Sequence, residues 1–378
     1  MTILQGLIND PNAPSPIYTD SPPSVPVLPS DVGLPCIMLA DRDTHRTWWG
    51  LGPFQETNST LEAMDSHINT WDIPRLVTVP FGLSPSISII TPRLWIKTDT
   101  PFPIHSESSS LLSATPRYHQ SMDEWCAMVN KVQADMPTGY QKMVLARQLS
   151  YESIPTEMRM PLLDRLTTAE SGVYRVLLSP SPNHGFLSLS PEHLFRRMNG
   201  TIELEALAGT RTHQQPIDCL NSEKNQQEHH AVSDWIREAL TPFTNDIHIS
   251  PSHPIQLRHV THTKTHISIP HIPTSDATLI QALFPTPAVG GVPRVESVSY
   301  LLRVNQPTGT LYRGLVGLVC RDWSIWVVMI RYAEWHHHNW TLYGGAGIMP
   351  QSDATEEWNE IDAKWRLFRN TFETIQST

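Results

Sequence analysis

The segment TIELEALAGTRT, residues 201–212, alternates apolar side chains with others and contains a cluster of small residues. On a strand, Ile202 and its apolar neighbours at alternate positions point to one face, and Glu203 and Glu205 point to the other. The pattern predicts a strand with one face on the core, followed by a tight turn at 208–210. Two interpretations of the acids stay open here: a solvent-facing edge, or a proton donor at the wall of a pocket.

Similar short apolar runs separated by turn residues occur on both sides of this segment. Helical spacing of apolar residues predicts three helices, at 121–136, 222–241 and 353–375, with Ser121 as the N-cap of the first. Strands and helices do not follow a regular βαβ rhythm. The order favours an α/β protein of the α+β type, with antiparallel sheets covered by helices.

Composition restricts the classes of function. The chain has 378 residues and a formal net charge of −10, so nucleic acid or an anionic membrane is not expected as its main partner. The four cysteines contain no CxxC pair, which favours reduced thiols in a cytoplasmic protein. No apolar stretch is long enough to span a bilayer, and the N-terminus has no secretory pattern.

Lys142 lies in the strand-like segment KMVLAR, on the same side as Val144 and Ala146. A buried lysine without a carboxylate partner loses its proton more easily, because burial penalises the charged form. Such a lysine can serve as a general base near neutral pH. The alternative is a lysine at a strand end whose amine reaches water.

Three glutamates on the last two predicted helices are candidate metal ligands. Glu228 lies on the apolar stripe of the helix at 222–241, and Glu357 and Glu360 share one face of the last helix, one turn before Lys364. Inward carboxylates from two helices suit Mg²⁺, which prefers oxygen ligands. The alternative is ordinary surface pairing of glutamate with lysine.

Two further segments could bind an anion. The glycine-rich stretch YGGAGIM, residues 343–349, leaves backbone N–H groups accessible, although a tight turn between a strand and a helix would read the same way. Arg331 interrupts an apolar strand and needs a partner, for which an anionic ligand is one candidate. The three histidines at 336–338 predict a solvated hairpin turn.

Together and in order, these motifs resemble the chorismate-utilising enzymes, which include anthranilate, aminodeoxychorismate, isochorismate and salicylate synthases. The matching segments are KMVLAR, FLSLSPEHLF, EALAGTRT, KNQQEHHAV, VTHTKTHI, FPTPAVGGVPR, MIRYAEW and YGGAGIMPQSDATEEWNEIDAKW. The resemblance implies a single domain of two packed antiparallel sheets with helices outside. It divides the chain into a proline-rich arm (1–35), an N-terminal part of the sheet domain (36–117) and a chorismate-binding core (118–376).

The resemblance also implies an activity. Lysine at 142 is typical of members that add water, and Ala288 is typical of isochorismate synthases that stop before pyruvate is expelled. We therefore expect an isomerase that converts chorismate to isochorismate, of the menaquinone or siderophore type. The alternatives are a salicylate synthase, or a non-catalytic chorismate-binding relative, since YRGLVG is shorter than the family pattern.

Residue roles follow from the same resemblance. Lys142 is the base for water at C2, and a protonated Glu205 is the acid for the C4 hydroxyl. Glu228, Glu360 and Glu357 are expected to hold Mg²⁺. The expected substrate-binding residues are Ala208, Gly209, Thr210, His262, Ala288, Arg331, Gly345, Gly347 and Lys364. We further expect a monomer or weak dimer that works in the cytoplasm, without nucleic acid or membrane.

Overall fold

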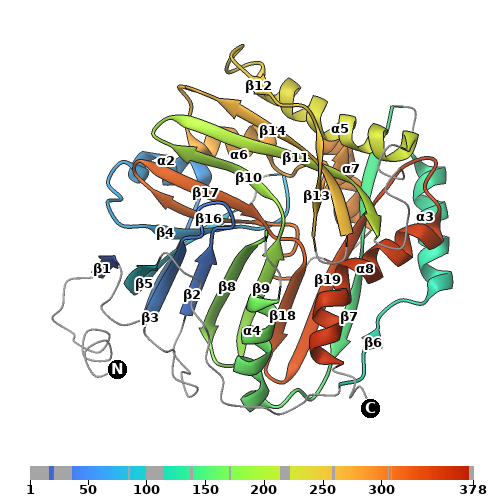
Figure 1. The fold of residues 1–378 in the computed structure, drawn as a ribbon, viewed down its shortest axis with the longest axis horizontal. Helices are drawn as coiled ribbons and strands as arrows, with labels where there is room; N and C mark the ends of the chain where they lie inside the picture. The colour runs from blue at the N-terminus through green and yellow to red at the C-terminus, as the bar shows by residue number, and fades with distance from the viewer. Residues whose placement is uncertain are drawn as a thin grey trace.

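A computed structural model gives the fold (Figure 1). It describes residues 17–20, 36–83, 86–98, 114–136, 139–169, 172–212, 222–257, 260–304, 306–307 and 309–373. The strands form one continuous hydrogen-bonded network, in which strand β5 connects two sheets. Every pairing in it is antiparallel, apart from the short β1 against β5.

The first sheet brings together strands that are far apart in the sequence. In spatial order it contains β7 (Lys142–Tyr151), β19 (Asn339–Ile348), β18 (Tyr332–His336), β9 (His184–Ser190), β8 (Tyr174–Ser181), β2 (Cys36–Ala40), β3 (Thr47–Ser59) and β5 (Ile87–Thr98). At its end, β7 also pairs with β15 (Gly291–Val292) and β6 (Arg117–Tyr118).

The second sheet begins where β5 also pairs with β4. Its order is β4 (Arg75–Val79), β16 (Leu315–Cys320), β17 (Trp323–Val328), β10 (His193–Met198), β11 (Thr201–Thr212) and β14 (Val260–Ile269). Two short strands, β12 (His248–Ile249) and β13 (His253–Gln256), pair with β14 at the edge. The segment quoted at the outset is therefore a strand near the edge of this sheet.

Apolar side chains form three layers. One cluster lies between the sheets and joins residues of β2, β8 and β9 to residues of β4, β16 and β17. The other two clusters lie under the helices on the outer faces. The helices are α2 (Leu61–Ile68), α3 (Met122–Asp135), α4 (Arg159–Thr168), α5 (Glu223–Leu240), α6 (Asp276–Leu283), α7 (Arg294–Arg303) and α8 (Ala354–Phe372), with a 3₁₀ turn at Thr156–Met158. This arrangement confirms the predicted sheets and outer helices.

The three predicted helices are present. Ser121 caps α3, and its hydroxyl accepts a hydrogen bond from the Glu124 N–H in a capping box. On α8 the predicted stripe includes Trp365 and Phe368, which are buried, whereas Ile375 lies outside the described residues. The histidines at 336–338 join β18 to β19 as a hairpin, as predicted.

The stretch 343–349 belongs largely to β19 and pairs with β7, which excludes the alternative of a tight turn. One local prediction was wrong. The small residues at 208–210 do not end a strand: β11 continues to Thr212, and Gly209 takes a positive φ of 76° at an irregularity in its pairing with β14. Glycine adopts this backbone conformation without steric cost, so the strand can bend there and continue.

The N-terminal part of the chain is built into the sheets. Within the predicted arm, β1 (Ile17–Asp20) pairs with β5, and β2 and β3 pair inside the first sheet. The boundaries at 35 and 117 stay predictions. Of the four cysteines, the three within the described ranges are free thiols, and Cys219 lies outside those ranges. Among the described helices, none is long and apolar enough to cross a membrane.

Candidate functional site

A cavity is formed where the two sheets meet α5 and α8. Most of the predicted site residues line it: Lys142, Ala208, Thr210, Glu228, His262, Ala288, Arg331, Gly345, Gly347 and Lys364. Glu205, Gly209, Glu357 and Glu360 are not among its lining residues. Glu192, Tyr312 and Arg313 also line the cavity, and none of them is among the predicted site residues. The fold thus brings together residues that are up to about two hundred positions apart.

Lys142 begins β7 and is buried, with 3% of its surface exposed. Its Nζ lies 2.7 Å from Oε1 of Glu228, which comes from the inward face of α5. The sequence interpretation assumed a buried lysine without a carboxylate partner, and that assumption is wrong for this structure. The ion pair with Glu228 must therefore open before the Lys142 nitrogen can act on a ligand.

Glu192 lies between β9 and β10 and reaches the same cavity as Lys142. Its backbone is fixed, because its N–H donates to Ser190 Oγ at 3.1 Å and its carbonyl accepts from the Val328 N–H at 3.1 Å. Burial raises the pKa of Glu192 to about 7, and the negative charge of Glu205 adds to this effect while Lys142 opposes it. At neutral pH this carboxyl group therefore exists in both protonation states, as a general acid requires.

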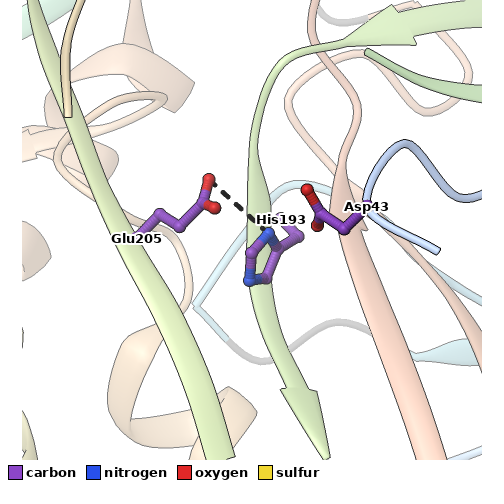
Figure 2. Close-up of side chains that lie close together, drawn as sticks. All are labelled: Asp43, His193 and Glu205. Atoms are coloured by element: carbon purple, nitrogen blue, oxygen red, sulfur yellow. Dashed lines mark ion pairs between the residues drawn. The ribbon is translucent and has the colours of Figure 1, made fainter. Parts of the chain in front are cut away.

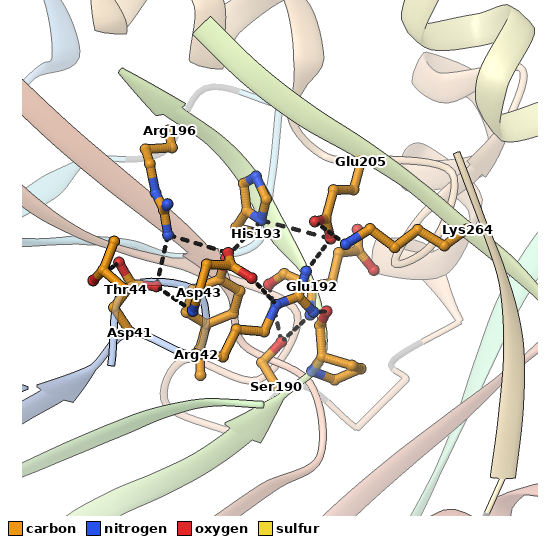
Figure 3. A network of polar contacts seen from close by, with 12 residues as sticks. Asp41, Arg42, Asp43, Thr44, Ser190, Glu192, His193, Arg196, Glu205 and Lys264 are labelled. Carbon is orange, nitrogen blue, oxygen red and sulfur yellow. Dashed lines mark hydrogen bonds and ion pairs between the residues drawn. The ribbon is translucent and has the colours of Figure 1, made fainter. Parts of the chain in front are cut away.

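Glu205 does not have the environment that we predicted. Arg42 and Lys264 both form ion pairs with its carboxylate, and His193 Nδ1 lies 3.7 Å from Oε2 (Figure 3). Burial alone would raise the pKa of Glu205, but His193, Arg42 and Lys264 together lower it below the usual value. The prediction that Glu205 is a protonated acid in the pocket is therefore wrong, because two cations that sequence alternation cannot reveal hold it ionised.

The Glu205 carboxylate belongs to a buried polar network beside the cavity. Arg42 donates both to Glu205 and to the carbonyl oxygen of Pro191, the residue that precedes Glu192. On the far side, Arg196 donates to Asp41 at 2.6 Å and to Asp43 at 3.1 Å (Figure 3). The network thus connects the turn after β2 to the backbone beside Glu192.

Three residues of this network have the composition of a metal site. Potential ligand atoms of Asp43, His193 and Glu205 lie within 4.8 Å of one another, with the imidazole between the two carboxylates (Figure 2). Arg42 and Arg196, however, already pair with these carboxylates. Cations at these positions repel a metal ion and provide the neutralising charge themselves. We therefore interpret this triad as a structural ion network.

The carboxylates that suit a metal lie elsewhere, around Lys364. This lysine lines the cavity and forms a 2.7 Å ion pair with Glu360, one turn away on α8. Burial would lower the pKa of Lys364, but Glu360, Glu228 and Glu357 outweigh it and raise the pKa. Glu357 is 1% exposed and accepts a hydrogen bond from Ser352 Oγ at 2.7 Å. Three carboxylates from two helices therefore act on the charge of Lys364, which lines the cavity.

Gly345 and Gly347 present backbone groups to the cavity. Gly345 pairs with Ala146 of β7, and Gly347 pairs with Val144. The N–H groups of these two partners point away from β19, because Ala146 donates to Gln306 and Val144 donates to Gly290. The two glycines therefore occupy non-hydrogen-bonded positions, and their N–H groups face away from β7. A side chain on Gly347 would collide with Lys142 and come within 3.0 Å of Glu228 Oε1. The absence of side chains keeps this wall open.

His262 on β14 connects two other predicted residues. Its Nδ1 lies 3.0 Å from the Thr210 hydroxyl, and its Nε2 lies 3.4 Å from Nη2 of Arg331. Burial lowers the pKa of His262 well below the usual value, and Arg331 and Lys364 add to the effect. The imidazole is therefore neutral and positions side chains without adding charge.

The sequence interpretation missed Glu192. The segment FLSLSPEHLF was recognised as a motif, but its glutamate was given no role. A signal was present: Pro191-Glu192 places an acid between two apolar strands, where a surface edge is not expected. Tyr312, which lies in the segment YRGLVG, also lines the cavity.

Comparisons with known proteins agree with this geometry. Residues 93–372 match the chorismate binding enzyme family. The isochorismate synthase MenF of Pasteurella multocida (strain Pm70) is 30% identical over 255 residues, which cover 64% of this chain and 59% of that protein. MenF of Escherichia coli (strain K12) is 29% identical over 232 residues, which cover 59% of this chain and 54% of that protein. The matches thus span less than two thirds of these relatives.

Solved structures show the same fold. The menaquinone-specific isochorismate synthase MenF of Escherichia coli has a TM-score of 0.76 at 22% identity, covering 89% of this chain and 88% of that chain. DhbC of Bacillus anthracis has a TM-score of 0.77 at 21% identity, covering 89% and 95%. The family match extends over most of the chain and includes every residue that lines the cavity. The protein therefore belongs to the chorismate binding enzyme family.

Proposed function

We propose that this protein is an isochorismate synthase, an isomerase that converts chorismate to isochorismate. The proposal is supported above all by Lys142 and Glu192, a buried amine and a buried carboxyl group in one cavity, with the pKa of Glu192 at about 7. The isomerisation adds a hydroxyl at C2 of the ring and removes one at C4. It therefore needs one group that takes a proton and one that gives a proton.

Lys142 is the proposed base. Its amine takes a proton from the water that attacks C2, and this requires that the ion pair with Glu228 has opened.

Glu192 is the proposed acid and replaces Glu205 in this role. It donates its proton to the departing C4 hydroxyl, and the ring double bond shifts between the two carbons. Since the Glu192 backbone is hydrogen bonded on both sides, little motion is needed to deliver the proton.

The carboxylates beside Lys364 fit Mg²⁺. Glu228, Glu357 and Glu360 supply only oxygen donors, and all three raise the pKa of the neighbouring Lys364. When bound there, Mg²⁺ would supply positive charge for the ring carboxylate of chorismate and compete with Lys142 and Lys364 for their glutamates. Arg331 and the N–H groups of Gly345 and Gly347 would then bind the carboxylate of the side chain.

The test is a product assay. Purified protein is incubated with chorismate and Mg²⁺, and the products are separated by liquid chromatography. We expect isochorismate without pyruvate, and no product in the presence of a chelator. Unchanged chorismate after long incubation would support the non-catalytic alternative, and equimolar pyruvate would support a salicylate synthase.

We also infer the setting in which the protein works. The net charge of −10 gives no reason to expect nucleic acid or a membrane surface as partner. Supply of isochorismate to quinone synthesis agrees with the printed name of the menaquinone-specific relative. Siderophore synthesis is the other expected setting, and we expect a cytoplasmic monomer or weak dimer. Size-exclusion chromatography with light scattering would test the oligomeric state.

A further inference from the structure

Histidines lie side by side at the ends of two neighbouring strands, away from the cavity. Strands β9 and β18 are adjacent (Figure 1), and their register places His184 directly across from His336. His337 follows in the two-residue turn between β18 and β19. Asn339, where β19 begins, is six positions from Gly345 of the cavity wall, which is about 20 Å along a strand. The histidine cluster, His184, His336 and His337, is therefore separate from the proposed mechanism.

The strand pairing brings two of the imidazoles together. Just beyond the pair of His184 and His336, the His337 N–H donates to the Asn183 carbonyl oxygen at 2.6 Å, which marks a hydrogen-bonded position. His184 and His336 therefore occupy the neighbouring non-hydrogen-bonded position, where side chains of antiparallel strands approach most closely. Their ring centres are 5.8 Å apart, and the ring planes are inclined at 64°.

His337 adds a third imidazole from the turn. Its backbone has a positive φ of 55°, and its ring centre lies 4.8 Å from that of His336. His336 and His337 are exposed and His184 is half-buried, so a hydrated ion can reach the histidine cluster from solvent. Because His337 is exposed, its side chain can also rotate to direct a ring nitrogen towards such an ion.

The spacing of the rings suits a single transition metal ion. Zinc–nitrogen bonds of about 2.0–2.1 Å place the centres of two imidazoles at a tetrahedral angle about 5 Å apart. The observed distances of 5.8 Å and 4.8 Å lie on either side of this value. Imidazole nitrogen suits zinc, copper and nickel, whereas magnesium prefers oxygen. The histidine cluster therefore differs in metal preference from the glutamates of the cavity.

We propose that His184 and His336, assisted by His337, bind a divalent transition metal ion of the zinc class at the protein surface. Water molecules complete its coordination. The ion joins β9 to the turn between β18 and β19, two segments that are about 150 positions apart in the sequence. Because the pair exists only in the folded chain, metal binding stabilises the fold against thermal unfolding.

Zinc binding by matched variants tests the proposal. Metal-free protein is mixed with excess Mg²⁺, which occupies oxygen ligands, and is titrated with zinc chloride in a calorimeter. We expect His336→Gln to lose one bound zinc ion per chain or to bind it at least about tenfold more weakly, since loss of even an outer-shell partner costs that much. His184→Gln should cause a loss of the same size, and His337→Gln a smaller one.

His338→Gln is the matched control. His338 is exposed in the same turn, but its Nδ1 lies 3.2 Å from the carbonyl oxygen of Ile154, on a different segment. This variant should bind zinc as the wild type does. With a chelator present, wild type, His336→Gln and His338→Gln should unfold at the same temperature. Zinc should then raise Tm of the wild type and of His338→Gln, and leave Tm of His336→Gln unchanged.

The outcomes decide the proposal without any turnover of chorismate, so they are independent of the proposed function. A wild type that binds no zinc in excess Mg²⁺, or a His336→Gln variant that binds it equally well, would overturn the site. Equal losses in His336→Gln and His338→Gln would also overturn it, because the ion would then bind to the turn and not to the facing pair.

Discussion

Glu192 and Glu205 are equally buried, each with 6% of its surface exposed, yet their surroundings give them opposite properties. Glu205 contacts Arg42 and Lys264, which lower its pKa and keep it ionised. Glu192 faces the cavity, and its pKa rises to about 7. Burial alone therefore does not identify an acid catalyst. The cations that touch the carboxylate decide its pKa, and of these two glutamates only Glu192 has the pKa that the proposed acid requires.

The largest expected effect separates these two glutamates by activity. Glu192→Gln removes the proton donor, so kcat for isochorismate formation should fall by about 10²- to 10⁴-fold. Circular dichroism and thermal unfolding should match the wild type, because the amide has the same shape. Glu203→Gln, a half-exposed neighbour of Glu205 on β11, is the matched control and should retain full activity. Normal turnover by Glu192→Gln would remove Glu192 from the acid role.

The second effect concerns stability. Arg42→Met leaves the Glu205 carboxylate buried with one cation fewer, and the free energy of unfolding should fall by about 3–5 kcal/mol. Urea denaturation measures this change. The double variant Arg42→Met/Glu205→Met should recover much of the loss, because both charges are then gone. A double variant that is no more stable than the single one would contradict the role of the ion pair.

A smaller effect is expected at the glutamates of α8. Glu360→Gln removes one proposed oxygen ligand. The Mg²⁺ concentration that gives half-maximal activity should therefore rise by about 10- to 100-fold. A Mg²⁺ titration of activity gives the half-saturating concentration. Glu356→Gln, exposed on the same helix, is the control. If Glu360→Gln and Glu356→Gln need the same Mg²⁺ concentration for half-maximal activity, Glu360 is not a ligand of the metal.

The smallest effect is the pH dependence. Since burial raises the pKa of Glu192 to about 7, the carboxyl group is protonated below this pH and loses its proton above it. An acid catalyst must hold its proton, so kcat/KM should decrease on the alkaline side by about tenfold per pH unit. The Glu192→Gln variant should lack this alkaline decrease in its residual activity. A wild-type profile that stays flat from pH 6 to 9 would contradict this assignment.

The sequence predicted the layers of the fold because alternation and helical spacing report which face of an element is buried. Alternation on 201–212 placed Ile202 on the core correctly. It could not show that the other face of β11 meets Arg42, which comes from a turn 163 residues earlier. Because Arg42 lies so far from Glu205 in the sequence, the pattern around Glu205 could not predict this ion pair or the ionised carboxylate.

The glycines of β19 show a second limit. A glycine-rich stretch usually predicts a turn, yet here each glycine makes room for a neighbour. A side chain on Gly344 would meet Trp365 of α8 at 2.7 Å, and one on Gly347 would meet Lys142. These contacts depend on the packed arrangement, so the sequence could not show which neighbours the glycines of this strand make room for.

The hydrogen bond from Arg42 to the carbonyl oxygen of Pro191 connects the N-terminal part of the chain to the cavity. It therefore limits how far the protein can be shortened from its N-terminus. All residues that line the cavity lie between 142 and 365, and the family match begins at residue 93. A fragment that starts there would contain the complete set of reacting groups and still lack the guanidinium beside Glu192 and strands β2 to β4. Such a truncated enzyme should be inert by itself. We therefore expect the smallest active unit to include the N-terminal quarter of the chain, although that part contributes no residue to the cavity lining.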